Sequence, residues 1–228
     1  MPPRVPPPRF IEDLTAEERR LFRRLRTPGA IQDYLDRIPI NFEPDGQTCR
    51  SPRGVLRAGV AHCLEAAFLA AAAFWFHGRP PLLLDLKARR DDFDHVVAPF
   101  LERGRWGAIS KTNHAVLRWR DPVYFSPREL AMSYFHEYFK DSGRKTLVSH
   151  SRPFDLSRRD AGWVTSEKNL WHLQYALDRA RHDPIAPRRA LRRLRPAAEL
   201  ERRAGRLVEW RKPKSGPRSP QQYGAERR

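Results

Sequence analysis

A cysteine and a histidine about thirty residues apart are the two side chains of this sequence best suited to covalent chemistry. Cys63 follows a glycine-led segment, 59–62, and precedes an apolar run, 66–76. That run has the length and composition of a buried helix, and Gly78 and the prolines after it would end the helix. Cys63 is therefore predicted in the first helical turn, where unpaired backbone N–H groups and the helix dipole favour the reactive thiolate.

His95 belongs to a different kind of segment, 92–98, in which polar and apolar residues alternate as in an extended strand. An imidazole on a strand that faces the start of the helix could accept the thiol proton of Cys63. A single cysteine in a helix rich in alanine and phenylalanine is more often a packing residue. The hypothesis of an activated nucleophile therefore depends on the combination of helix start, strand histidine and the polar segment after it.

These segments together resemble the transglutaminase-like superfamily, a branch of the papain-like cysteine enzymes. The resemblance covers about residues 31–124 and rests on four segments: 59–63, 78–86, 94–100 and 105–110. It implies an α+β fold in which a catalytic helix packs on an antiparallel sheet, with additional helices at both ends. In that superfamily the cysteine attacks an amide or ester carbonyl, the histidine is general base and then acid, and an Asp or Asn orients the histidine.

The resemblance gives Cys63 the role of nucleophile and His95 that of base, and it leaves the orienting residue open. An orienting aspartate would be expected near Ser110, where the chain has Ser110-Lys111-Thr112-Asn113. Asn113 could orient the imidazole through its side-chain oxygen, and Ser110 could do so more weakly, so we prefer Asn113. Asp85 and Asp94 are further alternatives.

Gln47 precedes the cysteine in a polar segment and could supply an N–H to an oxyanion, although a surface turn residue is the simpler interpretation.

Several residues near this pair are of types that bind metal ions: His62, Cys63, Asp92, Asp94 and His95. Structural zinc sites usually use paired ligands at short regular spacing, and neither C-x-x-C nor H-x-x-x-H occurs in the sequence. We therefore predict no metal and no cofactor. Asp92 and Asp94 are interpreted as solvent-facing groups at a strand end, and Glu65 as a charge that stabilises the helix N-terminus.

The composition predicts one domain with extensions at both ends. A chain of 228 residues with 40% hydrophobic content can bury one substantial core. We place a transglutaminase-like domain at 11–183, between a disordered proline-rich arm, 1–10, and an arginine-rich helix with a disordered tail, 184–228. Two cysteines make no disulfide framework, and no secretory signal or membrane span is recognisable. The sequence therefore predicts a cytoplasmic protein without a membrane partner.

The pattern of apolar residues predicts helices and strands in an order that suits an α+β fold. Beside the helix that starts at Cys63, helices are predicted at about 15–26, 28–38, 127–139 and 167–181. Strands are predicted at 82–86, 93–100, 106–110, 115–119 and 146–149, and a loop at 39–57.

Charge is concentrated at the C-terminal end. From Arg179 onward the chain has 16 Lys or Arg against five Asp or Glu, out of a net charge of +17. Non-specific binding of polyanions is the functional interpretation. Arginine outnumbers lysine 37 to 7 in the whole chain, and such a bias can arise without selection for binding. Residues 190–207 have helical composition, and 212–228 are predicted to be disordered.

The sequence thus favours a cysteine-dependent acyl-transfer enzyme whose thioester is resolved by water or by an amine. Its substrate would be a protein or a small-molecule amide or ester. The distal part, 120–149, resembles uncharacterised bacterial proteins of the superfamily. The alternative is a scaffold that has lost catalysis and acts as a binding module, with the basic tail attached to polyanions.

Overall fold

The computed structural model describes residues 9–208 of the chain. The helices are α1 (Ala16–Arg24), α2 (Pro28–Arg37), α3 (Pro52–Ala58), α4 (Cys63–Phe76), α5 (Pro127–Ser133), α6 (Trp171–Asp178), α7 (Arg188–Leu191) and α8 (Glu199–Gly205). The strands are β1 (Leu82–Ala88), β2 (His95–Glu102), β3 (Arg105–Ile109), β4 (Arg120–Tyr124), β5 (Leu147–Ser151), β6 (Phe154–Asp155) and β7 (His182–Pro184). Short 3-10 helices lie at Arg9–Ile11, Phe135–Glu137, Leu156–Arg158 and Ala161–Trp163.

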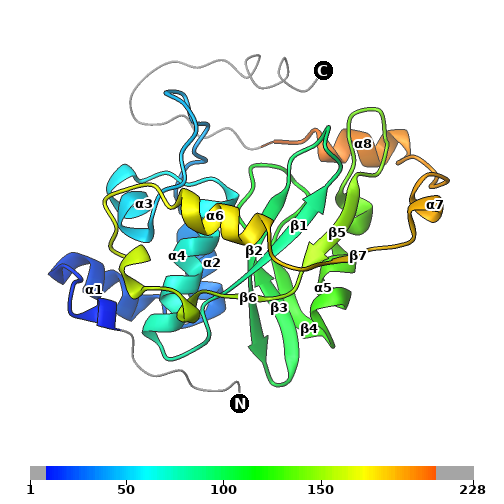
Figure 1. Cartoon of the computed structure of the whole chain (residues 1–228). Helices are drawn as coiled ribbons and strands as arrows, with labels where there is room; N and C mark the ends of the chain where they lie inside the picture. The colour runs from blue at the N-terminus through cyan, green and yellow to red at the C-terminus, as the bar shows by residue number, and fades with distance from the viewer. Residues whose placement is uncertain (1–8, 209–228) are drawn as a thin grey trace.

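The strands form one antiparallel sheet in the order β4-β3-β2-β1-β5-β7, with β6 paired to β1 (Figure 1). Helices cover both faces of this sheet. One core cluster joins α4 and its helical neighbours to Leu83 of β1, and a second joins α5 to Leu84 and Leu86. Because successive strand residues point to opposite faces, β1 needs a nearly continuous apolar run to bury both sides. The predicted α+β class with an antiparallel sheet is confirmed at this level.

Helix α4 begins at Cys63, as the sequence predicts, and forms the centre of the larger core. Every residue from position 64 to position 75 is buried. A helix that is apolar on all sides must be surrounded by other elements, and here these are the sheet on one side and α2 and α3 on the other (Figure 1). Because the apolar residues have to be enclosed, the first turn of α4 lies at the N-terminal end of the apolar segment, at the edge of the core.

The sheet brings two strand ends together beside that first turn. His95 is the first residue of β2 and pairs with Leu86 of β1. Strand β3 pairs with β2 in a register that sets Ile109 opposite Ala98. Ser110, which follows β3, therefore lies one strand away from His95.

The predicted strand at 115–119 is wrong, because β4 starts at Arg120 and the preceding residues are irregular. Leu117 lies in this segment with φ at +61°, a left-handed conformation that an extended strand does not contain. The predicted loop 39–57 contains α3, which Ser51 caps by accepting a hydrogen bond from Gly54 N–H.

Two predicted helices are shorter in the structure than the apolar pattern indicated. Helix α5 ends at Ser133, and a 3-10 turn continues the chain where helix was predicted to 139. Helix α6 starts after Leu170, not after Ser166, because Leu170 N–H is bonded to the carbonyl of Cys49 and the preceding chain is irregular.

The core extends beyond the predicted domain limits of 11–183 at both ends. Phe10, placed in the predicted arm, is only 1% exposed, and Ile185 and Ala197 from the arginine-rich region are also buried. The predicted helix at 190–207 is two short helices, α7 and α8, separated around Pro196. Residues 1–8 of the predicted arm and the predicted disordered tail at 212–228 lie outside the described residues.

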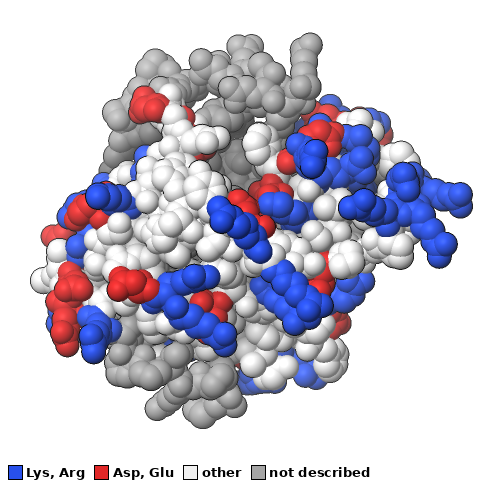
Figure 2. All heavy atoms as spheres, in the orientation of Figure 1, with Lys and Arg blue, Asp and Glu red and all other residues white. Residues whose placement is uncertain are grey.

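Surface charge is unevenly distributed over the face drawn in Figure 2, where blue and red side chains alternate over most of the molecule and the α7 end is blue. Helix α7 carries Arg188 and Arg189, and Arg192 and Arg193 follow directly. Among the described residues, no helix has the length and apolar character needed to span a membrane.

Burial of Ile185 generates a prediction about stability. Replacing Ile185 with alanine removes a fully packed side chain from the second core cluster and should lower the free energy of unfolding by about 2–5 kcal/mol. Val123→Ala, at a position that is 59% exposed, is the control and should stay within about 0.5 kcal/mol of wild type. Urea denaturation followed by circular dichroism measures both. Equal midpoints for the two variants would show that the arginine-rich region does not contribute to the core.

Candidate active site

Cys63 lies at the exact junction between a short loop and the buried body of α4. Gly59 ends α3 in a left-handed conformation, with φ at +64°, that glycine adopts without steric cost. A parallel bridge between Ile40 and Ala61 then fixes the chain just before the helix. Cys63 remains partly exposed, whereas the residues after it are buried. The local sequence thus places a partly exposed cysteine at the helix N-terminus.

Two imidazoles, those of His62 and His95, act on the Cys63 thiol through hydrogen bonding and charge. Burial is the largest influence and would raise the pKa of the thiol. Hydrogen bonds and charge from the two imidazoles oppose it, and the pKa of Cys63 is held well below its ordinary value. The structure therefore brings the predicted nucleophile and base together, and it adds a second histidine.

His95 is oriented by Ser110. The Nε2 atom of His95 lies 2.8 Å from Ser110 Oγ, and the same hydroxyl is bonded to the carbonyl oxygen of Leu117. A carbonyl can only accept, so the single hydroxyl hydrogen is directed to Leu117, and Oγ accepts a hydrogen bond from His95 Nε2–H. The other ring nitrogen of His95, Nδ1, is then the atom available to the thiol.

Ser110 is itself held by contacts that are distant in sequence. Gln32 of α2 accepts a hydrogen bond from Ser110 N–H at 3.0 Å and donates one to the Ser110 carbonyl at 2.8 Å. Leu117, which receives the hydroxyl hydrogen, donates its N–H to Glu137 at 2.7 Å. Glu137 in turn forms an ion pair with Arg120 at 2.6 Å. This chain of contacts holds Leu117 in its strained left-handed conformation and so fixes the acceptor for Ser110.

The preferred orienting residue, Asn113, lies elsewhere. It lines a small surface pocket with Ile40 and Lys111, and no hydrogen bond joins it to His95 among the described residues. The geometry therefore supports Ser110, the weaker of the two candidates from sequence. Gln47 is exposed, in agreement with a surface turn residue, and no contact between Gln47 and Cys63 occurs in the described part of the chain.

Two aspartates considered as alternatives are engaged with other groups. Asp85 lies 3.0 Å from His182 Nε2, and Asp94 accepts a hydrogen bond from Ala88 N–H at 2.8 Å. Asp94 also pairs with the ammonium group of Lys87 at 2.6 Å. Neither carboxylate has a hydrogen bond to His95 within residues 9–208, so neither one orients the imidazole.

A group of carboxylates close enough to bind a cation does occur within residues 9–208, at Asp85, Asp94 and Asp178. The ammonium group of Lys87 lies 3.1 Å from Asp178 and 3.9 Å from Asp85, in addition to its contact with Asp94. The ammonium group of Lys87 therefore already balances part of the negative charge of these three carboxylates.

His62 is the main residue of the site that the sequence analysis underestimated. Burial lowers its pKa, but contact with Cys63, the charge of Glu65 and a hydrogen bond with the Thr48 carbonyl raise the pKa to about 9. These contacts favour the imidazolium form of the side chain. Its position directly before Cys63 is the feature of the sequence that could have indicated a contact with the thiol, whereas the sequence pattern was interpreted only in terms of metal binding. Gln32 and Glu137 gave no such local signal because they act over a long sequence separation.

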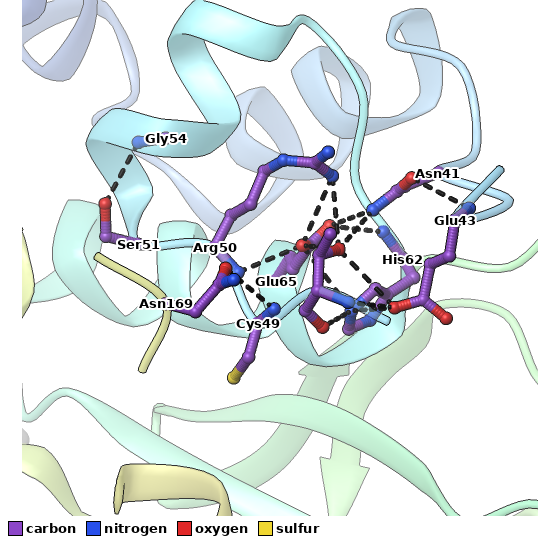
Figure 3. A network of polar contacts seen from close by, with 10 residues as sticks. Asn41, Glu43, Cys49, Arg50, Ser51, Gly54, His62, Glu65 and Asn169 are labelled. Atoms are coloured by element: carbon purple, nitrogen blue, oxygen red, sulfur yellow. Dashed lines mark hydrogen bonds and ion pairs between the residues drawn. The ribbon is translucent and has the colours of Figure 1, made fainter. Parts of the chain in front are cut away.

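Glu65 forms the centre of a polar network behind the first turn of α4 (Figure 3). Its carboxylate is fully buried and accepts hydrogen bonds from Asn41 Nδ2, the Thr48 hydroxyl and Arg50 N–H at 2.7–3.0 Å. It also accepts from His62 N–H at 3.1 Å. The predicted role of Glu65 at the helix start is thus accompanied by a role in holding the loop before the cysteine.

No known family model matches the chain, and no curated protein is significantly similar to it in sequence. The resemblance to the transglutaminase-like superfamily therefore stays a prediction, and the functional argument depends on the geometry of the site.

The two cysteines should differ strongly in reactivity. Cys49 is buried, and burial together with the charge of Glu65 raises the pKa of its thiol to about 12, whereas the pKa of Cys63 is lowered. Iodoacetamide at about pH 6.5 should therefore label Cys63 first, because an unperturbed thiol ionises near 8.5 and only a thiolate reacts. Peptide mapping of the native protein measures the two rates. Equal or reversed rates would exclude an activated Cys63.

The orienting residue can be tested by comparing two alanine variants. Ser110→Ala removes the acceptor of His95 Nε2–H and should lower the rate of any acyl transfer that this site would catalyse by at least about tenfold, the size of effect expected when a base loses its alignment. Asn113→Ala should have little effect, because Asn113 is not bonded to His95. Thermal melting of both variants serves as the folding control. The opposite ranking would return the orienting role to Asn113.

Proposed function

We propose that this protein is a cysteine-dependent acyl-transfer enzyme with a papain-like, transglutaminase-like architecture. The observation that carries the proposal is the arrangement of three groups. Cys63 lies partly exposed at the start of a buried helix, His95 reaches its sulfur, and Ser110 fixes the imidazole. These are the nucleophile, the proton carrier and the orienting group that acyl transfer requires.

The chemistry divides into two half-reactions. The Cys63 thiolate attacks the carbonyl carbon of an amide or ester and forms an S–C bond, while the carbonyl π electrons move to oxygen. Unpaired N–H groups of the first turn of α4 would stabilise that oxyanion. Protonated His95 gives its proton to the leaving amine or alcohol, and a thioester remains on Cys63. Neutral His95 then takes a proton from water or an incoming amine, which attacks the thioester and releases the thiolate.

Ser110 in the orienting position distinguishes this site from a triad with a carboxylate. A neutral hydroxyl fixes the ring tautomer of His95 but adds no negative charge to stabilise the imidazolium. The substrate of the proposed enzyme is an amide or ester of a protein or a small molecule.

The proposal is tested with activated acyl donors of several chain lengths, such as p-nitrophenyl esters, on the full chain. Wild type should form a covalent acyl adduct visible by intact mass, and Cys63→Ala should form none. His95→Ala should lower turnover by about 10²–10⁴-fold, the usual contribution of a general acid–base group. Cys49→Ala is the matched control and should keep full turnover. Added primary amine distinguishes transamidation from hydrolysis through the mass of the product.

Two outcomes would contradict the proposal. Turnover that survives in Cys63→Ala would move the chemistry away from this site. A reactive Cys63 that forms no acyl adduct with any donor would favour the alternative, a catalytically impaired scaffold that acts as a binding module.

A further inference from the structure

The thiolate of Cys63 has two histidine neighbours, and one of them is unused in the mechanism above. We propose that His62 and its buried counter-ion Glu65 form a second activating pair that keeps Cys63 ionised whatever the protonation state of His95. This inference rests on the proposed function for its purpose, because a permanent thiolate serves acyl transfer. Its evidence is separate and consists of the contacts of His62.

The hydrogen bonds of His62 define which ring nitrogen faces the sulfur. Nε2 lies 3.0 Å from the carbonyl oxygen of Thr48. Because a carbonyl can only accept, Nε2 carries a hydrogen, and Nδ1 is left for the neighbouring Cys63. Ionisation of the thiol is then a local proton transfer. The S–H bond breaks, its proton goes to Nδ1, and the electron pair stays on sulfur, which gives an imidazolium beside a thiolate.

The groups around the ring favour this charged form. Glu65 Oε1 lies 3.5 Å from His62 Nε2, and Glu43 Oε1 lies 3.7 Å from it. Arg50 contacts Glu65 at 3.4 Å on the far side and is the one Lys or Arg paired with this carboxylate among the described residues. Two carboxylates and a thiolate thus surround the imidazolium of His62, with His95 beyond the sulfur. In Figure 3, Glu65 lies between Arg50 and His62, which places the negative charge between two positive ones.

Hydrogen bonds keep Glu65 ionised although its carboxylate is buried. The carboxylate is 0% exposed and accepts hydrogen bonds from five donors, which stabilise the ionised form. Burial raises the pKa of Glu65, but the charge of His62 and the hydrogen bonds lower it further than burial raises it. Loss of the proton from His62 would leave this carboxylate without its nearest cation on the side of the sulfur.

A division of labour between the two histidines follows. During turnover His95 has to be protonated at one step and neutral at the next. If His95 alone held the thiolate, each loss of its proton would weaken the charge that stabilises the sulfur. With His62 permanently protonated, His95 carries only the proton that passes to the leaving group and returns from water.

The decisive experiment measures how the rate of Cys63 alkylation depends on pH, in the full chain and without any acyl substrate. His62→Gln should raise the midpoint of the profile by roughly 1–3 units, the effect of removing an adjacent opposite charge. Its alkylation rate at about pH 6.5 should fall at least about tenfold and recover at high pH. His95→Gln should shift the midpoint less but should lower acyl transfer by about 10²–10⁴-fold at every pH. His172→Gln, at an exposed position of α6, is the control and should change neither.

A second measurement covers the case in which His62→Gln does not fold. Histidine ¹⁵N NMR of wild type should show the His62 ring still protonated above neutral pH. In Cys63→Ser, which lacks the thiolate, the ring should lose its proton at lower pH. An unchanged alkylation midpoint in folded His62→Gln, or identical His62 titrations in wild type and Cys63→Ser, would overturn the inference. Because alkylation needs no acyl donor, failure of the proposed function would appear in the acyl-adduct assay alone.

Discussion

The site depends on one buried carboxylate, that of Glu65. A carboxylate that is removed from water needs donors or cations, since an unpaired buried charge costs several kcal/mol. The chain meets this need by folding the segment around Asn41, Thr48 and Arg50 over the first turn of α4. The same contacts hold the loop in which the Thr48 carbonyl accepts a hydrogen bond from His62. The position of Cys63 is thus a consequence of satisfying a charge two residues away.

The remainder of α4 explains why that charge lies at the helix start. Helix α4 is apolar on every side because the sheet and the surrounding helices enclose it. Polar groups are tolerated only at its ends, where backbone N–H groups need partners. Its N-terminus therefore collects Cys63 and Glu65, whose pKa values are both lowered, and His62, whose pKa is raised, lies beside them.

The other half of the site has a different physical basis. His95 and Ser110 are positioned by the register of β2 and β3, and Ser110 is fixed by Gln32 from a helix and by the left-handed Leu117. Backbone strain of this kind costs about 1–3 kcal/mol and persists only where surrounding contacts impose it. Here the Glu137 carboxylate and the Ser110 hydroxyl each bind one backbone group of Leu117, so the strain is tied to the orientation of the histidine.

The sequence by itself determined the features that depend on neighbouring residues. The apolar run after Cys63 predicted the buried helix and its first turn, and alternation predicted the strand that carries His95, although β2 starts two residues later than predicted. Local patterns failed where distant contacts outweighed them. The β-like composition of 115–119 is overridden by the contacts of Leu117, and the side-chain chemistry that favoured Asn113 says nothing of which residue lies beside His95. The raised pKa of His62 comes mainly from Cys63 and Glu65, which are near it in sequence, and from the Thr48 carbonyl, which the fold supplies. Only the tertiary structure decided that Ser110 orients the imidazole of His95, because the end of β3 and the distant Gln32 must converge on one buried point.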